Sequence, residues 1–75
     1  KMSLRRTAIR VVETYGLLHK ANLTALRLYI KEHTEDELVK EVKDIREAPL
    51  LRALWEAGLS QRLQDAVMEQ LGKIS

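Results

Sequence analysis

Residues 67–74 read Val-Met-Glu-Gln-Leu-Gly-Lys-Ile, and their pattern occurs twice more in the chain. Apolar residues fall at the first, second, fifth and eighth positions, which places them on one stripe of a helix. Residues 38–45 and 11–18 repeat this spacing at offsets of 29 and a further 27 residues. Such recurrence indicates stacked helical units. The stripe residues are Val67, Met68, Leu71 and Ile74; Leu38, Val39, Val42 and Ile45; and Val11, Val12, Tyr15 and Leu18.

Local signals set the ends of the predicted helices. Thr34 and Glu37 have the spacing of a capping box, in which each side chain binds the other residue's amide. Pro49 suits the first turn of a helix, and Gly58 suits a helix end. Ser3, Asn22 and Ser60 are further candidate N-caps. The sequence therefore predicts five helices, at about residues 4–18, 22–32, 35–45, 49–57 and 61–72.

The composition predicts an all-α protein. The 75 residues allow a single small helical domain, residues 1–75, and its core must be aliphatic because phenylalanine is absent. One proline and three glycines leave little material for the turns of a β-rich fold. Without cysteine there is no disulfide or thiolate metal site. We expect about five short antiparallel helices, stacked as a helical repeat or closed into a compact bundle. The chain lacks a long apolar stretch, so we expect it to be cytoplasmic and not membrane-bound.

The chain resembles the HEAT-like α-helical repeat (α-solenoid) families. Their second helix commonly ends in a Leu-Gly-x-Ile type signature, to which residues 71–74 and Tyr15-Gly16-Leu17-Leu18 are similar. Ala66 stands where such helices often place a small residue, whereas the middle copy, ending in residues 43–45, has no glycine. The resemblance implies stacked antiparallel helix pairs that present a surface to a partner. It implies no catalytic residues.

The charge distribution is uneven, although the net charge is only +2. Residues 1–31 carry seven lysines or arginines against one acid, and residues 32–75 carry six against ten. A basic cluster near the N-terminus could neutralise several phosphates of a nucleic acid without reading its sequence. The alternative is a solvated helix face whose long side chains cover apolar flanks. The candidate nucleic-acid residues are Arg5, Arg6, Arg10 and Lys20.

The apolar stripe of the last predicted helix indicates a surface that could bind a protein partner. End units of a helical stack keep an exposed apolar stripe unless something caps them. Trp55 is the only tryptophan, and its size favours core packing, although a half-exposed tryptophan marks many contact surfaces. The candidate docking residues are Trp55, Met68, Leu71 and Ile74. We therefore expect a protein-protein interaction module or scaffold subunit, with self-association as one form of it. A small nucleic-acid-binding accessory protein is the alternative.

The sequence gives no support to an enzyme. His33 and Glu37 have a metal-ligand spacing, but the capping box places a helix break between them, and zinc needs further ligands. No glycine-rich loop is available to hold phosphate, and no nucleophile elbow surrounds Ser60. We expect no catalytic residue, metal, cofactor or small-molecule substrate. A helix-turn-helix at residues 58–60 is disfavoured because Asp65 and Glu69 on the following helix would repel DNA phosphates.

Overall fold

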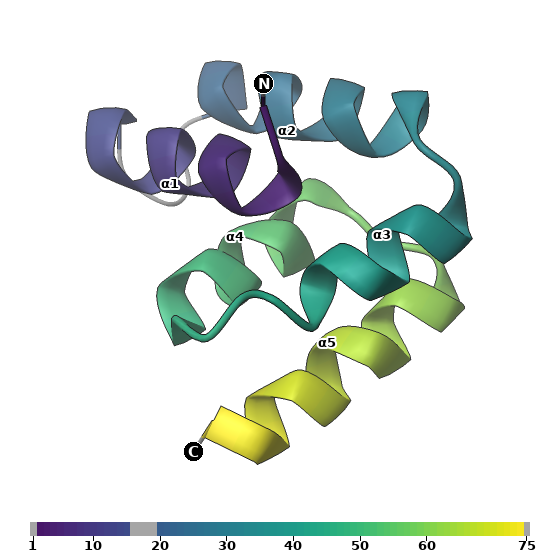
Figure 1. Cartoon of the computed structure of the whole chain (residues 1–75). Coiled ribbons are helices and arrows are strands. Elements are labelled where there is room, and N and C mark those ends of the chain that lie inside the picture. The colour runs from purple at the N-terminus through teal and green to yellow at the C-terminus, as the bar shows by residue number, and fades with distance from the viewer. Residues whose placement is uncertain (1, 16–19, 75) are drawn as a thin grey trace.

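The structure is a computed structural model that describes residues 2–15 and 20–74, with side chains described for residues 2–13 and 23–74. The described part of the chain is all-helical, as predicted (Figure 1). Its helices are α1 (Leu4–Tyr15), α2 (Lys20–Glu32), α3 (Glu35–Val42), α4 (Ala48–Ala57) and α5 (Gln61–Ile74). Within the described ranges, no helix is both long enough and apolar enough to cross a membrane.

The helices close into a compact bundle with extents of 27 × 27 × 23 Å. In Figure 1, α1 and α2 form an upper layer, α3 and α4 lie beneath them, and α5 runs below both. Helix α1 packs against α2 and also against α4, while α5 packs against α3 and α4. The contact between α1 and α4 joins helices that a linear stack in chain order would keep apart. Of the two expected architectures, the structure has the compact bundle and not the linear stack.

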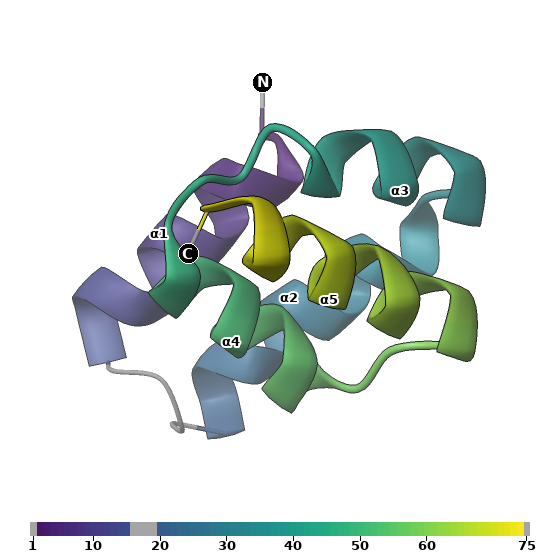
Figure 2. The same ribbon diagram turned by 90° about the horizontal axis from the view of Figure 1, so that it is seen from below.

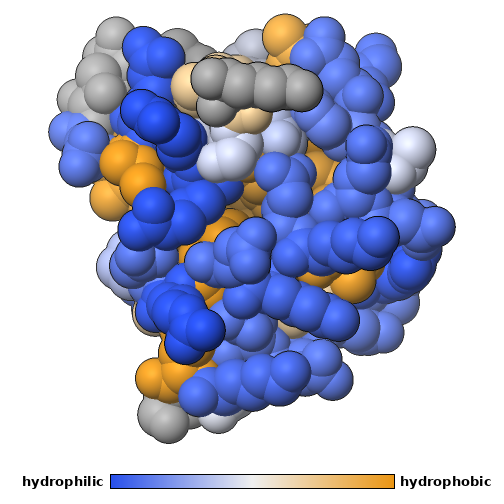
Figure 3. All heavy atoms as spheres, in the orientation of Figure 1, coloured by the Kyte–Doolittle hydropathy of each residue, from blue (hydrophilic) through white to orange (hydrophobic). Residues whose placement is uncertain are grey.

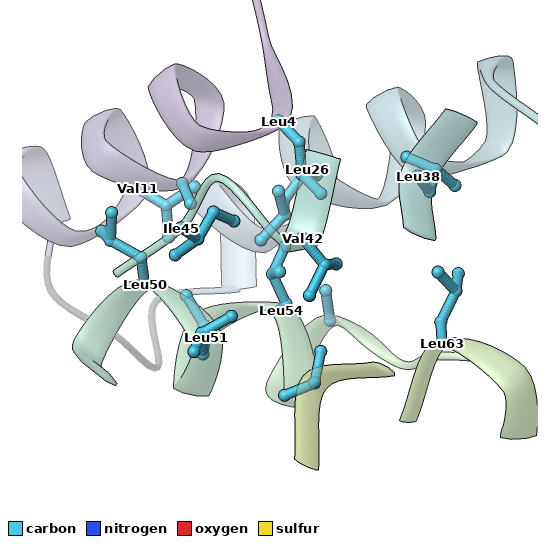
Figure 4. Close-up of a cluster of buried hydrophobic side chains, with 14 of the residues drawn as sticks. Leu4, Val11, Leu26, Leu38, Val42, Ile45, Leu50, Leu51, Leu54 and Leu63 are labelled. Atoms are coloured by element: carbon cyan, nitrogen blue, oxygen red, sulfur yellow. The ribbon is translucent and has the colours of Figure 1, made fainter. Parts of the chain in front are cut away.

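The core is aliphatic and receives side chains from every helix (Figure 4). Leu26, Leu51 and Leu54 are fully buried at its centre, and Leu38 and Leu63 lie where α3 meets α5. The repeated stripe explains much of this core, because its first position is buried in all three copies. The second position differs: Val12 and Val39 are half-buried, whereas Met68 is 58% exposed. The third copy thus turns one stripe residue outward.

The capping signals at Ser3, Thr34, Pro49 and Gly58 act as the sequence predicts. Thr34 and Glu37 form the reciprocal capping box, with the Glu37 amide donating to Thr34 Oγ1 over 3.2 Å. Ser3 Oγ accepts from the Arg6 amide at the start of α1. Pro49 lies in the first turn of α4, and Gly58 ends that helix with a φ of 93°. At this φ a residue with a Cβ would be strained.

Several predicted helix ends were wrong by a few residues. Helix α2 begins at Lys20, so Asn22 is not its N-cap. Helix α3 ends at Val42, and the chain then tightens into turns in which the Ile45 amide donates to the Val42 carbonyl. Helix α5 continues through Gly72 to Ile74, because this glycine keeps a helical backbone. The predicted end of the first helix, residues 16–18, lies outside the described residues.

Candidate protein-docking groove

An apolar groove runs between α4 and α5, which lie side by side in Figures 1 and 2. Its volume is about 340 Å³. Leu51 and Val67 are fully buried at its floor, and Leu71 is half-buried along one side. The full lining, called the α4–α5 groove from here on, is Ala48, Leu51, Arg52, Trp55, Glu56, Val67, Met68 and Leu71.

Two large apolar side chains stand exposed on this groove. Trp55 from α4 is 41% exposed and Met68 from α5 is 58% exposed. Exposed apolar residues are ordinary when scattered singly, but two that share one apolar groove form a patch suited to contact with another molecule. In the orientation of Figure 3, one hydrophobic patch lies at the lower left, where α5 ends in Figure 1.

The position of Trp55 corrects the core placement that its size favoured. Helix α4 already directs Leu50, Leu51 and Leu54 into the core, together with Ala53 and Ala57. Trp55 follows Leu54 by one residue, and a step of about 100° around the helix turns it away from that buried face. The structure brings three of the four predicted docking residues together, Trp55, Met68 and Leu71. The fourth, Ile74, packs half-buried against the core and does not line the groove.

A second apolar groove lies between α1 and α4, with a volume of about 310 Å³. Ile9 and Val12 line it from α1, and Pro49 and Leu50 line it from α4. The sequence analysis did not identify this groove, because it needs two helices that are far apart in the chain.

The predicted nucleic-acid residues lie in different surroundings: Arg5 is ion-paired, whereas Arg6 and Arg10 are exposed. Arg5 forms a two-pronged ion pair with Glu47, with Nη2 to Oε2 at 2.5 Å and Nε to Oε1 at 3.3 Å. This pairing raises the pKa of Arg5 and lowers the pKa of Glu47. Arg6 and Arg10 are exposed one turn apart on α1. The side chain of Lys20, at the start of α2, lies outside the described residues.

A polar cluster that the sequence analysis missed joins α1, α2 and α3. The Tyr29 hydroxyl donates to both carboxylate oxygens of Glu41, at 2.9 and 3.0 Å, and Glu41 also accepts from the Leu4 amide at 3.1 Å. His33 stacks on the Tyr29 ring with centroids 3.9 Å apart. Burial, with a smaller contribution from the hydrogen bond to Glu41, raises the pKa of Tyr29 to about 12. A phenol with this pKa stays protonated near pH 7 and is poorly matched to proton transfer there.

This polar cluster borders an open cavity of about 420 Å³, lined by Met2, Tyr29, His33, Glu37, Lys40 and Glu41. Its hydrogen bonds hold the N-terminus of α1 against α2 and α3, so its polar groups serve structural contacts. No signal in the sequence indicated it, because Tyr29 and Glu41 belong to different helices.

No protein-family model, curated protein or solved structure matches this chain.

Proposed function

We propose that the chain is a non-enzymatic interaction module that binds a protein partner through the α4–α5 groove. The observation that carries the proposal is the pair of exposed apolar side chains, Trp55 on α4 and Met68 on α5, at one apolar groove. Tryptophan in such a position is enriched among residues that dominate binding energy. Apolar surface contributes about 25 cal/mol per Å² when a partner removes it from water.

The ionisable groups support a binding role over a catalytic one. Perturbed pKa values cluster at active sites, where they bring acids and bases towards the working pH. Three described residues have a clearly shifted pKa, Arg5, Tyr29 and Glu47, and each of these pKa values moves further from neutrality. Their partners explain these shifts, since Arg5 pairs with Glu47 and Tyr29 binds Glu41.

Site-directed photocrosslinking tests the proposal. A photoreactive benzoylphenylalanine replaces Met68 in the groove, and the matched control replaces Leu28, which is 54% exposed on α2. We expect a discrete protein adduct from position 68, lost when Trp55→Asp is added, and no such adduct from position 28. The adduct is then reproduced with the purified partner. Equal labelling from both positions, or none from position 68, would contradict the proposal.

Nucleic-acid binding remains a second proposal, supported by the exposure of Arg6 and Arg10 one turn apart on α1. Salt separates the two. Counterion release weakens phosphate binding as salt rises, with a slope set by the number of phosphates contacted, whereas an apolar interface holds or tightens in strongly hydrated salts.

A further inference from the structure

We infer that the occupant of the α4–α5 groove is a second copy of this chain, packed about a two-fold axis close to Trp55. The inference rests on the proposed function and narrows the partner to one kind of protein. It stands on the charges at the groove, on a helical glycine beside it and on the size of the molecule.

The charged residues that line the groove on α4 are self-complementary. Arg52 and Glu56 line the groove on α4, one helical turn apart, with Trp55 between them. The salt bridges recorded among the described residues involve neither of them. Across a two-fold axis, residue i of one copy meets residue j of the other, and j meets i. Two antiparallel copies of α4 would therefore pair Arg52 with Glu56 twice, and each Trp55 would face the other copy's groove.

The same charges disfavour a strongly charged partner. The groove lining carries one positive and one negative side chain, so a highly acidic or basic surface gains nothing there. The whole chain has a net charge of +2, which gives only weak repulsion between copies. A partner that carries one positive and one negative side chain fits this groove. A second copy related by a two-fold axis presents these two charges, because its own groove contains Arg52 and Glu56.

Gly72 lies one turn beyond Met68 on α5. Glycine is a poor helix former, and this one does not have the positive φ of a left-handed helix cap. Among the described residues, no atom lies within 4 Å of where a Cβ on Gly72 would stand, so packing against these residues does not require glycine. The backbone of another chain can approach closely where a side chain is missing. A second copy packed over Met68 and Gly72 would occupy this open space.

The surface that a stable dimer must bury is a small part of this molecule. A stable interface buries at least about 1,000 Å² in total, or about 500 Å² per copy. The chain has 5013 Å² of accessible surface, so each copy would have to bury about a tenth of it. The groove alone does not supply this area, so the exposed residues of α4 that line it, Ala48, Arg52, Trp55 and Glu56, would have to take part in the contact.

Charge reversal tests the inference with a specific rescue. Sedimentation equilibrium over about 1–500 μM would measure dimerisation of the wild type, Arg52→Glu, Glu56→Arg and an equimolar mixture of the two variants. Each variant alone would place like charges opposite each other twice, and we expect about a tenfold weaker dimer. In the mixture, Glu at position 52 meets Arg at position 56, and Arg52 meets Glu56. We therefore expect the mixture to dimerise within about threefold of the wild type.

The outcomes separate this inference from the proposed function. Dimerisation with loss in the single variants and rescue in the mixture supports the second copy. A wild type that stays monomeric at about 500 μM, or variants that dimerise unchanged, would overturn it. A monomer whose position 68 still crosslinks to a different protein would leave the proposed function standing alone. Leu28→Asp serves as the control, because this exposed leucine lies on α2 and should leave dimerisation unchanged.

Discussion

Gln70 on α5 donates a hydrogen bond to the carbonyl oxygen of Ile45 over 2.7 Å, and its amide also reaches the carbonyl oxygen of Lys43 at 3.3 Å. Gln70 is buried, and both acceptors belong to the segment that joins α3 to α4. These carbonyls follow the end of α3, where the helix can no longer satisfy its own backbone. This side chain thus ties α5 to the connection between α3 and α4.

We expect Gln70→Met to destabilise the fold by about 1–3 kcal/mol. Methionine has a similar length but cannot donate, so the Ile45 carbonyl would remain buried without its partner. Urea unfolding followed by circular dichroism measures the change. Gln64→Met is the control, because Gln64 is half-buried on the same helix and its amide reaches Leu59 with a weaker hydrogen bond of 3.3 Å. Equal losses in the two variants would contradict the special role of Gln70.

The helices were predictable because their signals are local. A capping box, a proline and a glycine act within a few residues of themselves, so Thr34, Pro49 and Gly58 could be interpreted without a fold. The apolar stripe also identified buried positions such as Val42 and Val67. The helix ends were less accurate, because turns such as the one before Ile45 continue the buried stripe after the α-helix has ended.

The contacts between helices could not be predicted in the same way. Arg5 meets Glu47 across 42 positions, and Gln70 meets Ile45 across 25. Nothing near Arg5 in the sequence shows that a carboxylate will neutralise it. The sequence therefore overestimated the number of unpaired positive charges in the basic cluster. Trp55 illustrates the same limit. Its size favours the core, but neighbouring leucines fill that side of α4, and only the assembled bundle decides which residues remain outside.

Removal of the Thr34 hydroxyl should destabilise the fold by about 1 kcal/mol, because an N-cap side chain satisfies an amide that the helix leaves open. The hydroxyl accepts from the Glu37 amide at the start of α3. Thermal or urea unfolding of Thr34→Ala measures the loss. Thr34→Ser keeps the hydroxyl and should stay within about 0.5 kcal/mol of the wild type. A serine variant as unstable as the alanine variant would contradict the capping explanation.

Stability should fall in alkaline solution because of Tyr29. Its pKa rises from an ordinary 10.0 to about 12 in the folded protein, since burial and Glu41 disfavour the phenolate. Between these values the unfolded chain loses this proton and the folded chain keeps it, so the contribution is intact below pH 10 and is lost as pH rises towards 12. Near-ultraviolet absorbance of the phenolate follows the titration.

Tyr29→Phe should remove this late-titrating phenolate and flatten the corresponding part of the stability curve. The other tyrosine, Tyr15, is retained in the variant as an internal reference. If the absorbance change near pH 12 persists in Tyr29→Phe, the shifted phenol is not Tyr29.

Any binding of duplex DNA by the N-terminal face should depend only weakly on salt. With Arg5 paired to Glu47, Arg6 and Arg10 are the exposed guanidiniums that α1 offers to phosphates. Two phosphate contacts give a slope of about −2 for the logarithm of affinity against the logarithm of salt. Fluorescence anisotropy with a labelled duplex measures the slope, and Arg6→Ala/Arg10→Ala should abolish binding. A slope of about −4 would mean that the whole predicted basic cluster of four residues, including Lys20, contacts phosphate.

Gly72→Ala should separate the stability of one copy from the association of two. Alanine favours a helix over glycine by up to about 1 kcal/mol, and the added methyl group meets no atom of the described residues within 4 Å in a single copy. We therefore expect a more stable fold in urea. If a second chain packs over α5, the same methyl group would obstruct it, and dimerisation should weaken in sedimentation equilibrium. Greater stability with unchanged dimerisation would place the interface away from Gly72, whereas opposite changes in the two measurements would place it over the last turns of α5.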